Sequence, residues 1–85
     1  MLQDESDAPE EFCDELMGTV MSDPVRLPSG QVLDRDTMTR QFLANGNKNP
    51  YTNQPMMPED LQALDDLKAK IAAWRQDKRA KKGGD

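Results

Sequence analysis

Two short apolar runs on either side of a tight turn are the most strongly patterned part of the chain. Residues 25–27 and 32–33 are rich in β-branched and aliphatic side chains. Residues 28–31 between them pair a proline that presets one backbone angle with a glycine that tolerates positive φ, which predicts a β-hairpin. The apolar residues in front of it, beginning at Leu16, follow neither a helical nor a strand period. They indicate a loop that either packs into the core or contacts a partner.

A helix is predicted directly after the hairpin. Asp34 precedes residues 35–44, so its carboxylate can accept from the free backbone N–H groups of the first turn. Met38 and Phe42 lie four residues apart and share one helical face, with Leu43 beside them. The Asn-Gly-Asn that follows supplies a left-handed stop, so we expect about two and a half turns.

A second helix is predicted at the C-terminal end. A turn at residues 58–61 leads into five apolar residues at three- and four-residue steps, which form one face of a helix that runs to about Lys78. These residues are Leu61, Leu64, Leu67, Ile71 and Trp74. Residues 48–54 have the composition of a loop, residues 55–57 return to the core, and residues 80–85 should fray.

An acidic lead comes before the first patterned residues. Residues 8–13 resemble one helical turn, with Asp7 as its cap and Phe12 as the anchor into the core. We therefore divide the chain into three parts. They are a disordered or loosely ordered acidic lead (residues 1–9), one folded domain (residues 10–78) and a disordered basic tail (residues 79–85).

Composition limits how such a domain can be stabilised. The 85 residues are 35% hydrophobic and 32% charged, which allows one small core. One cysteine cannot form an intramolecular disulfide, and the chain has no histidine to complete a zinc site. We expect no metal and no cofactor, and a fold stabilised by packing, hydrogen bonds and ion pairs.

Composition also bears on the compartment. A single cysteine suits a reducing environment, and no apolar run approaches the ~20 residues that cross a bilayer. The N-terminus lacks the basic and apolar regions of a signal peptide. We expect a soluble protein of the cytoplasm, the nucleus or both, without membrane contact.

Charge is unevenly distributed within the net charge of −5. Eight acidic residues precede the first basic residue, Arg26, whereas seven basic residues crowd the end of the chain. One interpretation is a tail that binds nucleic acid. We favour the alternative, in which Lys and Arg in the last turns of a helix offset its dipole, and we expect no nucleic-acid partner.

Several short motifs, in a fixed order, resemble the U-box domain. The match covers residues 11–74 and is closest to the U-box that ends the ubiquitin conjugation factors of the ubiquitin fusion degradation pathway. It implies an α+β fold, a small zinc-free RING-like domain with a short β-hairpin, a central helix, two large loops and a C-terminal helix. The motifs are Phe12, Leu16-Met17, Val20-Met21, Asp23-Pro24-Val25, Leu27-Pro28-Ser29-Gly30, Asp34-Arg35, Asn49-Pro50-Tyr51, and Leu67-Lys68 with Ile71 and Trp74.

The resemblance implies that hydrogen bonds and ion pairs replace the zinc of RING domains. The alternative for each polar residue in these motifs is ordinary solvated turn chemistry. The candidates for a structural polar network are Ser22, Asp23, Ser29, Asp34, Arg35 and Asn49.

U-box domains bind a ubiquitin-charged conjugating enzyme and promote transfer of ubiquitin to a substrate lysine by positioning, with no covalent intermediate. The resemblance therefore assigns no catalytic residue. The alternative for the first residue of the docking surface, Leu16, is a place in the core. The docking residues implied are Leu16, Met17 and Gly18 in a first loop, and Pro50, Tyr51 and Thr52 in a second.

Cys13 is the one thiol that could act as a nucleophile, as in ligases that carry ubiquitin on a thiolate. The chain has no histidine to serve as a base, and Asp14 and Glu15 next to the thiol disfavour a thiolate. We expect a small, buried apolar role for Cys13.

Three positions depart from the family pattern. Glu15 follows Asp14 where many U-boxes have proline, which removes a rigid turn and adds charge beside the docking surface. Gly18 stands where a bulkier, often aromatic, residue can occur. Asn53 stands where an arginine usually bridges the conjugating enzyme and its ubiquitin, and asparagine lacks the charge and donor fork of guanidinium. We expect weaker transfer, or a neighbour such as Lys48 in that role.

Three functions are compared. We favour a ubiquitin ligase or chain-elongation module whose partners are a ubiquitin-conjugating enzyme with its conjugated ubiquitin, and protein substrates bound outside these residues. The second is a non-catalytic interaction or dimerisation module with the same fold. The third is a nucleic-acid-associated domain, which a salt-dependent gel shift would have to support.

Overall fold

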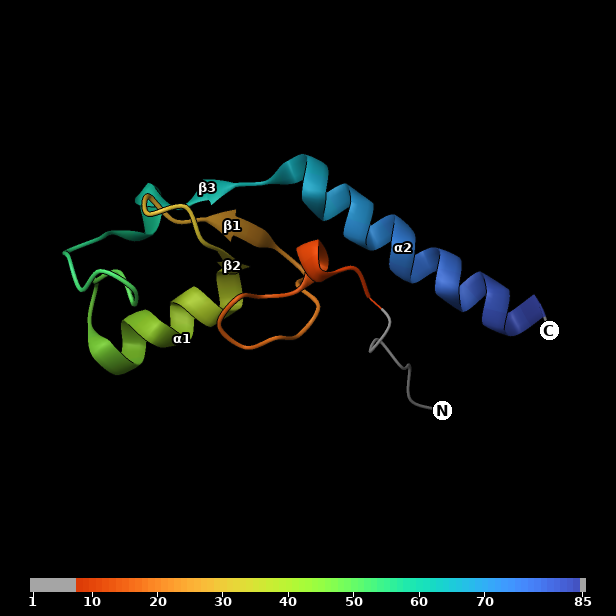
Figure 1. The fold of residues 1–85 in the computed structure, drawn as a ribbon, viewed down its shortest axis with the longest axis horizontal. Helices are drawn as coiled ribbons and strands as arrows, with labels where there is room; N and C mark the ends of the chain where they lie inside the picture. Colours follow the sequence, from red (N-terminus) through yellow and green to blue (C-terminus); the bar gives the residue numbers. More distant parts are fainter. Residues whose placement is uncertain (1–7, 85) are drawn as a thin grey trace.

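A three-stranded antiparallel sheet lies between two helices in the computed structural model, which describes residues 8–84, with side chains up to residue 77 (Figure 1). The α+β fold class is confirmed. Among the described residues, no helix is both long and apolar enough to cross a membrane. The elements in chain order are η1 (Glu10–Phe12), β1 (Pro24–Arg26), β2 (Val32–Asp34), α1 (Arg35–Asn45), η2 (Pro58–Asp60), β3 (Gln62–Ala63) and α2 (Asp65–Gly84).

The predicted β-hairpin is confirmed. β1 pairs with β2 in the register Val25↔Leu33 and Arg26↔Val32. The turn is closed by the Leu27 N–H, which donates to the Gln31 carbonyl at 2.8 Å. Gly30 has φ +104°, the left-handed conformation that this turn requires of one residue.

The predicted central helix is confirmed to within one residue at its C-terminal end. The Asp34 carboxylate accepts from the Asp36 N–H, and Gly46, at φ +88°, donates its N–H to the Phe42 carbonyl. Met38 is fully buried, as its position predicted. Leu43 differs from the prediction, because it is 84% exposed and faces away from the core.

The five-residue apolar stripe predicted at the C-terminal end is only partly helical. Residues 62–63 form β3, which pairs with β1, and the Leu64 N–H donates to the Pro24 carbonyl at 3.1 Å. Leu61 and Leu64 therefore precede the helix, which begins at Asp65. The prediction that the helix begins at Leu61 was wrong, because the backbone of residues 62–64 forms hydrogen bonds with β1 instead.

α2 also extends further than predicted. Its backbone continues past Lys78 to Gly84, so residues 79–84, assigned above to a disordered tail, are helical. Alanine, lysine and arginine are good helix formers, so these residues favour a helix even where the apolar stripe has ended. At the other terminus, η1 is preceded by Pro9. The predicted Asp7 cap and most of the acidic lead lie outside the described residues, and the domain limits 10–78 stay a prediction.

The core is divided into two clusters by the sheet. The first, between the sheet and α1, contains Val25, Leu27, Leu33, Met38 and Met56, with Phe42 and Leu61 packed against it. The second, between η1 and α2, contains Phe12, Val20, Met21 and Ile71. The Phe12 and Trp74 rings meet edge to face at 5.9 Å, which confirms Phe12 as the N-terminal anchor.

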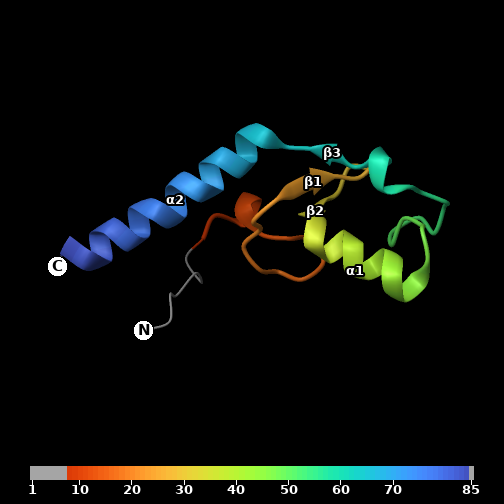
Figure 2. The same cartoon turned by 180° about the vertical axis from the view of Figure 1, so that it is seen from behind.

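α2 gives the molecule its elongated shape. The principal extents are 49 × 24 × 17 Å, and the second half of the helix projects away from the sheet in the views from the front and from behind (Figures 1 and 2). The packing contacts between helices and strands are therefore concentrated at the end of the molecule that holds the sheet. The candidate site also lies at that end.

Candidate docking site: two loops with one hydrogen-bond arrangement

Asp14 organises the first loop, residues 13–20, which is called loop 1. The side chain is only 1% exposed. Its Oδ1 accepts from the Leu16 N–H at 2.7 Å and from the Met17 N–H at 2.9 Å, and its Oδ2 accepts from the Asp34 N–H at 2.8 Å. One buried carboxylate thus fixes the backbone of the loop and ties it to β2.

Glu15 fastens loop 1 along the edge of β2. Its N–H donates to the Val32 carbonyl at 3.2 Å, and its Oε2 accepts from the Val32 N–H at 3.0 Å. A proline at this position has no N–H to donate. Two hydrogen bonds of Glu15 thus restrain the loop where many U-boxes have a rigid proline turn.

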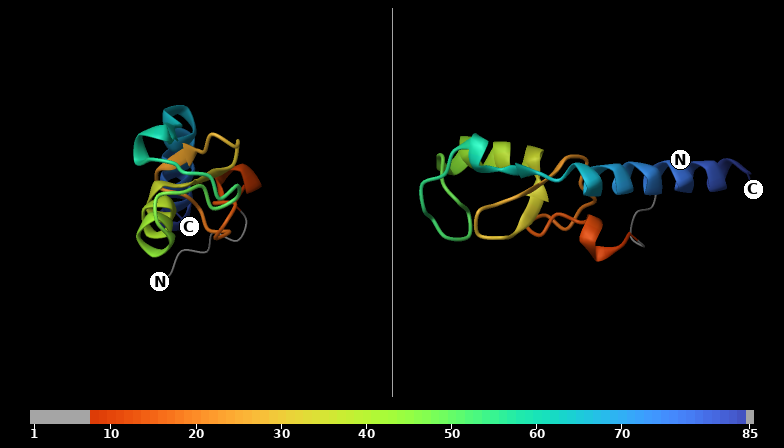
Figure 3. Two further views of the ribbon diagram at one scale, coloured as in Figure 1. Left: turned by 90° about the vertical axis from the view of Figure 1, so that its left-hand side faces the viewer. Right: turned by 90° about the horizontal axis from the view of Figure 1, so that it is seen from above.

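Asn49 organises the second loop, residues 48–55, which is called loop 2. The side chain is 3% exposed. Its Oδ1 accepts from the Tyr51 N–H at 2.8 Å and the Thr52 N–H at 3.2 Å, while its Nδ2 donates to Ser29 Oγ at 2.9 Å. Loop 2 is thereby fixed beside the hairpin turn, as the view from above in Figure 3 shows.

The two loops share one backbone arrangement. The Gly18 N–H donates to the Asp14 carbonyl at 2.7 Å, and the Asn53 N–H donates to the Asn49 carbonyl at 2.7 Å. Both donors have positive φ, +76° for Gly18 and +67° for Asn53. The correspondence is regular along the chain, because 49 − 14 and 53 − 18 are both 35.

The same offset relates the two ends of each loop. An isolated antiparallel bridge pairs Cys13 with Val20, and another pairs Lys48 with Pro55. Each loop is therefore closed at its base by one backbone bridge and inside by one buried Asx side chain. No repeat in the sequence letters signals this arrangement, because only the hydrogen-bonding roles repeat.

Positive φ explains two of the departures from the family pattern. Glycine adopts φ +76° without strain, so Gly18 suits its position. Asparagine is among the few other residues that tolerate this region, which suits Asn53 at φ +67°. Both departures reduce the strain of a positive φ at equivalent points of the two loops.

The docking residues named from the sequence lie on the outer side of these loops. Leu16 is 41% exposed, Met17 58% and Tyr51 41%, while Thr52 is exposed and Pro50 half-buried. The alternative that Leu16 belongs to the core is therefore wrong. These apolar side chains are presented to solvent on a backbone that is already fixed.

Tyr51 is influenced by charges that belong to the other loop. The pKa of its phenol is raised above the ordinary value of 10.0, first by burial and then by the negative charges of Glu15 and Asp14. Those carboxylates belong to loop 1, whereas Tyr51 belongs to loop 2. Charge on loop 1 therefore acts on the phenol of loop 2.

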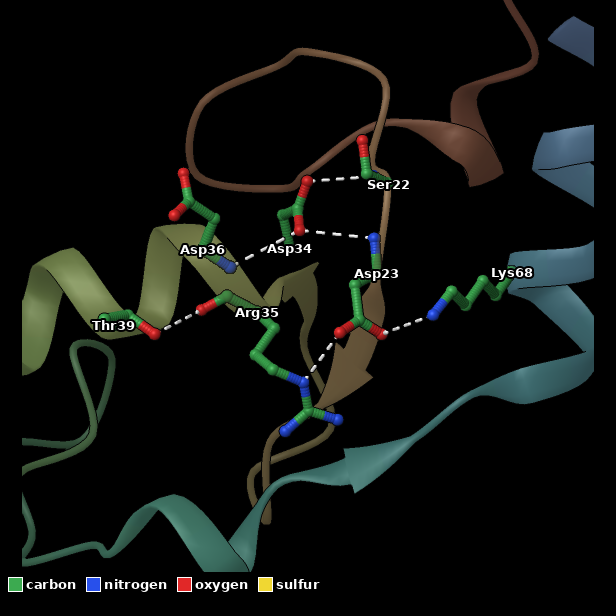
Figure 4. A network of polar contacts seen from close by, with 7 residues as sticks. All are labelled: Ser22, Asp23, Asp34, Arg35, Asp36, Thr39 and Lys68. Carbon is green, nitrogen blue, oxygen red and sulfur yellow. Dashed lines mark hydrogen bonds and ion pairs between the residues drawn. The ribbon is translucent and has the colours of Figure 1, made fainter.

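Four residues of the predicted polar network lie together behind loop 1 (Figure 4). The Asp34 carboxylate accepts from the Ser22 N–H at 2.9 Å and from the Asp23 N–H at 3.3 Å. Asp23 Oδ2 accepts from Arg35 Nε at 2.8 Å. Lys68 Nζ lies 3.8 Å from Asp23 Oδ1, which links the network to α2.

The other two predicted network residues, Ser29 and Asn49, bond to each other at loop 2, as described above. Sequence analysis missed Asp14, which does more for loop 1 than any predicted residue. It also missed Arg75, whose Nη1 donates to Ser22 Oγ at 3.1 Å and Nη2 to the Val20 carbonyl at 3.2 Å. An Asx residue at the start of an unpatterned apolar loop is the signal that could have found Asp14.

Cys13 lies beside the docking surface without being part of it. It is half-buried against the second core cluster, and its Sγ–H points to the Pro9 carbonyl at 3.7 Å. In the described part of the chain, no group of three His, Cys, Asp or Glu side chains is placed to bind a metal ion. The loops thus offer a surface for contact, and buried polar side chains fix the backbone that presents it.

The fold and the site together define a class of protein. It is a small α+β domain with two loops, each closed by a buried Asx side chain, and a polar network. Residues 8–80 match the U-box domain, so the chain belongs to the U-box family. It is 45% identical over 76 residues to ubiquitin conjugation factor E4 ufd-2 of Caenorhabditis elegans, which covers 89% of the chain. It is 35% identical over 74 residues to E4 ubiquitin-protein ligase UFD2 of Saccharomyces cerevisiae, which covers 86% of the chain.

A third relative, ubiquitin conjugation factor E4 A of Mus musculus, is 37% identical over 78 residues, or 91% of the chain. The chain spans about 8% of the length of each of these relatives. The similarity therefore concerns this one domain. The resemblance stated from the sequence is confirmed.

Proposed function

We propose that the chain acts as a ubiquitin-ligase or chain-elongation module that docks a ubiquitin-charged conjugating enzyme through loops 1 and 2. The family and the names of the relatives, which include ubiquitin conjugation factors and a ubiquitin-protein ligase, support this proposal. Protein substrates are proposed to bind outside the residues described here.

The observation that carries the proposal is the pairing of exposed apolar side chains with fixed backbones. Leu16 and Tyr51 are each 41% exposed, and each backbone N–H is bound by a buried Asx side chain. A partner that buries such side chains loses little conformational entropy, because the loops are ordered before binding. A few anchors of this kind dominate small interfaces.

The proposed mechanism is positioning without covalent chemistry. Docking the conjugating enzyme would restrict its attached ubiquitin to geometries near attack by an acceptor lysine, a gain in orientation and entropy. Cys13 stays outside the mechanism, because its thiol is half-buried and faces the Pro9 carbonyl.

Asn53 is proposed to stand at the bridging position toward the ubiquitin. Its amide can donate hydrogen bonds but carries no charge, so we expect modest stimulation. Asn53→Arg would add the guanidinium at a cost in stability of about 1 kcal/mol, because the backbone there has φ +67°. A gain in transfer from Asn53→Arg would support the assignment.

The test is discharge of ubiquitin from a preloaded conjugating enzyme to free lysine. The wild-type chain should accelerate discharge, and Leu16→Ala should weaken enzyme binding about tenfold, because burying a leucine contributes ~1.5–3 kcal/mol. Leu43→Ala is the matched control, since Leu43 is 84% exposed on α1, outside both loops. Leu16→Ala should leave the melting temperature nearly unchanged.

Two results would contradict the proposal. Folded wild-type chain that accelerates discharge from none of a broad panel of conjugating enzymes would argue against a role in transfer. Equal losses of binding from Leu16→Ala and Leu43→Ala would argue against loop 1 as the docking surface.

A non-catalytic interaction module is the second candidate, and the uncharged side chain of Asn53 favours it. The expected result in that case is binding of a conjugating enzyme that Leu16→Ala weakens, without faster discharge.

A further inference from the structure

The sheet has one face covered by α1 and one face that is only partly covered. In β1, Val25 points to the first core cluster together with its partner Leu33. Because successive side chains alternate in a strand, Arg26 and its partners Val32 and Gln62 point to the opposite face. That second face is bordered by η1, β3 and the first turns of α2.

A groove of about 1150 Å³ lies on this second face. Its floor includes the half-buried apolar side chains of Val32, Leu64 and Leu67. Its walls come from η1 and the start of loop 1 on one side, and from β3 and α2 on the other. The groove is open to solvent, and its volume accommodates a peptide segment.

The rim of the groove carries an excess of negative charge. Two cations, Arg26 and Lys70, stand among five exposed carboxylates. Within the part of the chain that is described, no ion pair within 4.0 Å joins either cation to these carboxylates. The carboxylates are those of Glu10, Glu11, Glu15, Asp65 and Asp66.

We propose that this groove is a docking surface for a lysine- or arginine-rich segment of a partner protein. Lysine or arginine side chains of the segment would meet the rim carboxylates, and apolar side chains between them would cover Val32, Leu64 and Leu67. Charge complementarity selects this occupant. A nucleic acid, which is an anion, is repelled by the same rim.

The spacing of the carboxylates also favours a segment over a single cation. Among the described residues, no three acidic side chains are close enough to bind one metal ion. Separate charges along an open groove instead match separate cations along a peptide. The groove shares Cys13 and Glu15 with loop 1 but none of the proposed docking residues, so it can be occupied independently of a conjugating enzyme.

The test is fluorescence anisotropy with a short fluorescein-labelled peptide of alternating lysine and valine. We expect saturable binding at low ionic strength that weakens as salt is added, because exposed charges are screened. The same peptide with glutamate in place of lysine should not bind. The two peptides differ only in the sign of their charges.

Charge reversal locates the site. The double variant Glu11→Lys with Asp66→Lys should weaken binding about tenfold, because it replaces two attractive contacts by repulsive ones. Glu59→Lys with Asp36→Lys is the matched control, since Glu59 and Asp36 are exposed carboxylates outside the groove. Arg26→Glu should strengthen binding. Circular dichroism and thermal melting check that each variant is folded.

Three results would overturn the proposal. The lysine peptide could fail to bind the folded wild-type chain at low salt. Glu59→Lys with Asp36→Lys could weaken binding as much as Glu11→Lys with Asp66→Lys does, which would reflect net charge alone. The wild-type chain could also self-associate, seen as sedimentation that depends on its concentration. If the variant Glu11→Lys with Asp66→Lys abolishes this self-association, a second copy of the chain is the occupant instead.

Discussion

The identities of the two buried Asx residues follow from the partners each one meets. All three partners of Asp14 are N–H donors, and a carboxylate offers only acceptors. Asn49 meets two N–H donors and the Ser29 hydroxyl, whose proton goes to Gln31 Oε1. With this proton on the Gln31 side, Ser29 Oγ accepts from Asn49 Nδ2, a donor that an amide has and a carboxylate lacks.

Asp14→Ala should reduce the free energy of unfolding by about 3 kcal/mol, because three N–H groups lose a charged acceptor. Asp14→Asn should cost less, since its oxygen can still serve the Leu16 and Met17 N–H groups. Urea denaturation measures both changes. Asp36→Ala is the control, because its carboxylate is exposed and pairs only with Arg40 one turn away.

An Asp14→Ala variant as stable as the control would contradict the role assigned to the buried carboxylate. Loss of stability with unchanged amide shifts at residues 16 and 17 would place the effect at the Asp34 N–H instead. The two contacts are thus distinguishable by NMR.

At the scale of elements, local chemistry was readable from the sequence. The hairpin was predicted from Pro28 and Gly30, the start of α1 from the Asp34 cap, and its end from Gly46. Each of these signals acts through residues within a few positions in the chain. Elements set by neighbours in sequence are therefore the predictable ones.

Elements set by distant partners were missed. β3 has two residues and exists because β1 offers it hydrogen bonds, a partner more than thirty residues away, so no local pattern announces it. Arg75 escaped notice for the same reason, since its contacts at Val20 and Ser22 lie across the core. The surface residues of the candidate site came from the resemblance, and the buried Asp14 that shapes them did not.

The influence of loop 1 on Tyr51 should be visible in the titration of this residue, the only tyrosine of the chain. Its raised pKa means that the folded chain retains the phenolic proton at pH values where the unfolded chain has lost it. This contribution to stability is complete below pH 10.0 and is lost as the pH rises through the pKa of the folded state. Absorbance of the tyrosinate measures the midpoint directly.

The native chain should titrate at a higher pH than the chain unfolded in urea. Glu15→Gln should move the native midpoint down, because it removes a carboxylate charge while keeping an oxygen for the Val32 N–H. Glu59→Gln, on η2, should leave it in place. A native midpoint that Glu15→Gln leaves unchanged would contradict an influence of loop 1 on Tyr51.

At the scale of the whole molecule, direct contacts between distant segments do the work of cross-links. Loop 1 is tied to β2 through Asp14, loop 2 to the hairpin turn through Asn49, and α2 to the base of loop 1 through Arg75. Among the described residues, no buried side-chain nitrogen or oxygen lacks a hydrogen-bond partner. Such satisfied networks stabilise one arrangement of a small domain.

A strong chelator should leave the melting temperature of the chain unchanged, because the chain has one cysteine and no histidine for a structural zinc site. Thermal melting followed by circular dichroism, with and without EDTA, measures this. A zinc-finger protein in the same buffer is the positive control. A lower melting temperature in EDTA would show that a metal contributes to the fold.

The residues that close the two loops are not the residues whose side chains the loops present. Leu16, Met17 and Tyr51 give only their backbone N–H groups to Asp14 and Asn49. Side-chain replacements at these three positions therefore remove none of those hydrogen bonds. Mutations at these positions can change which partner binds while the hydrogen bonds that hold the loops are kept. Such a domain can therefore diversify its partners in evolution without first losing its ability to fold.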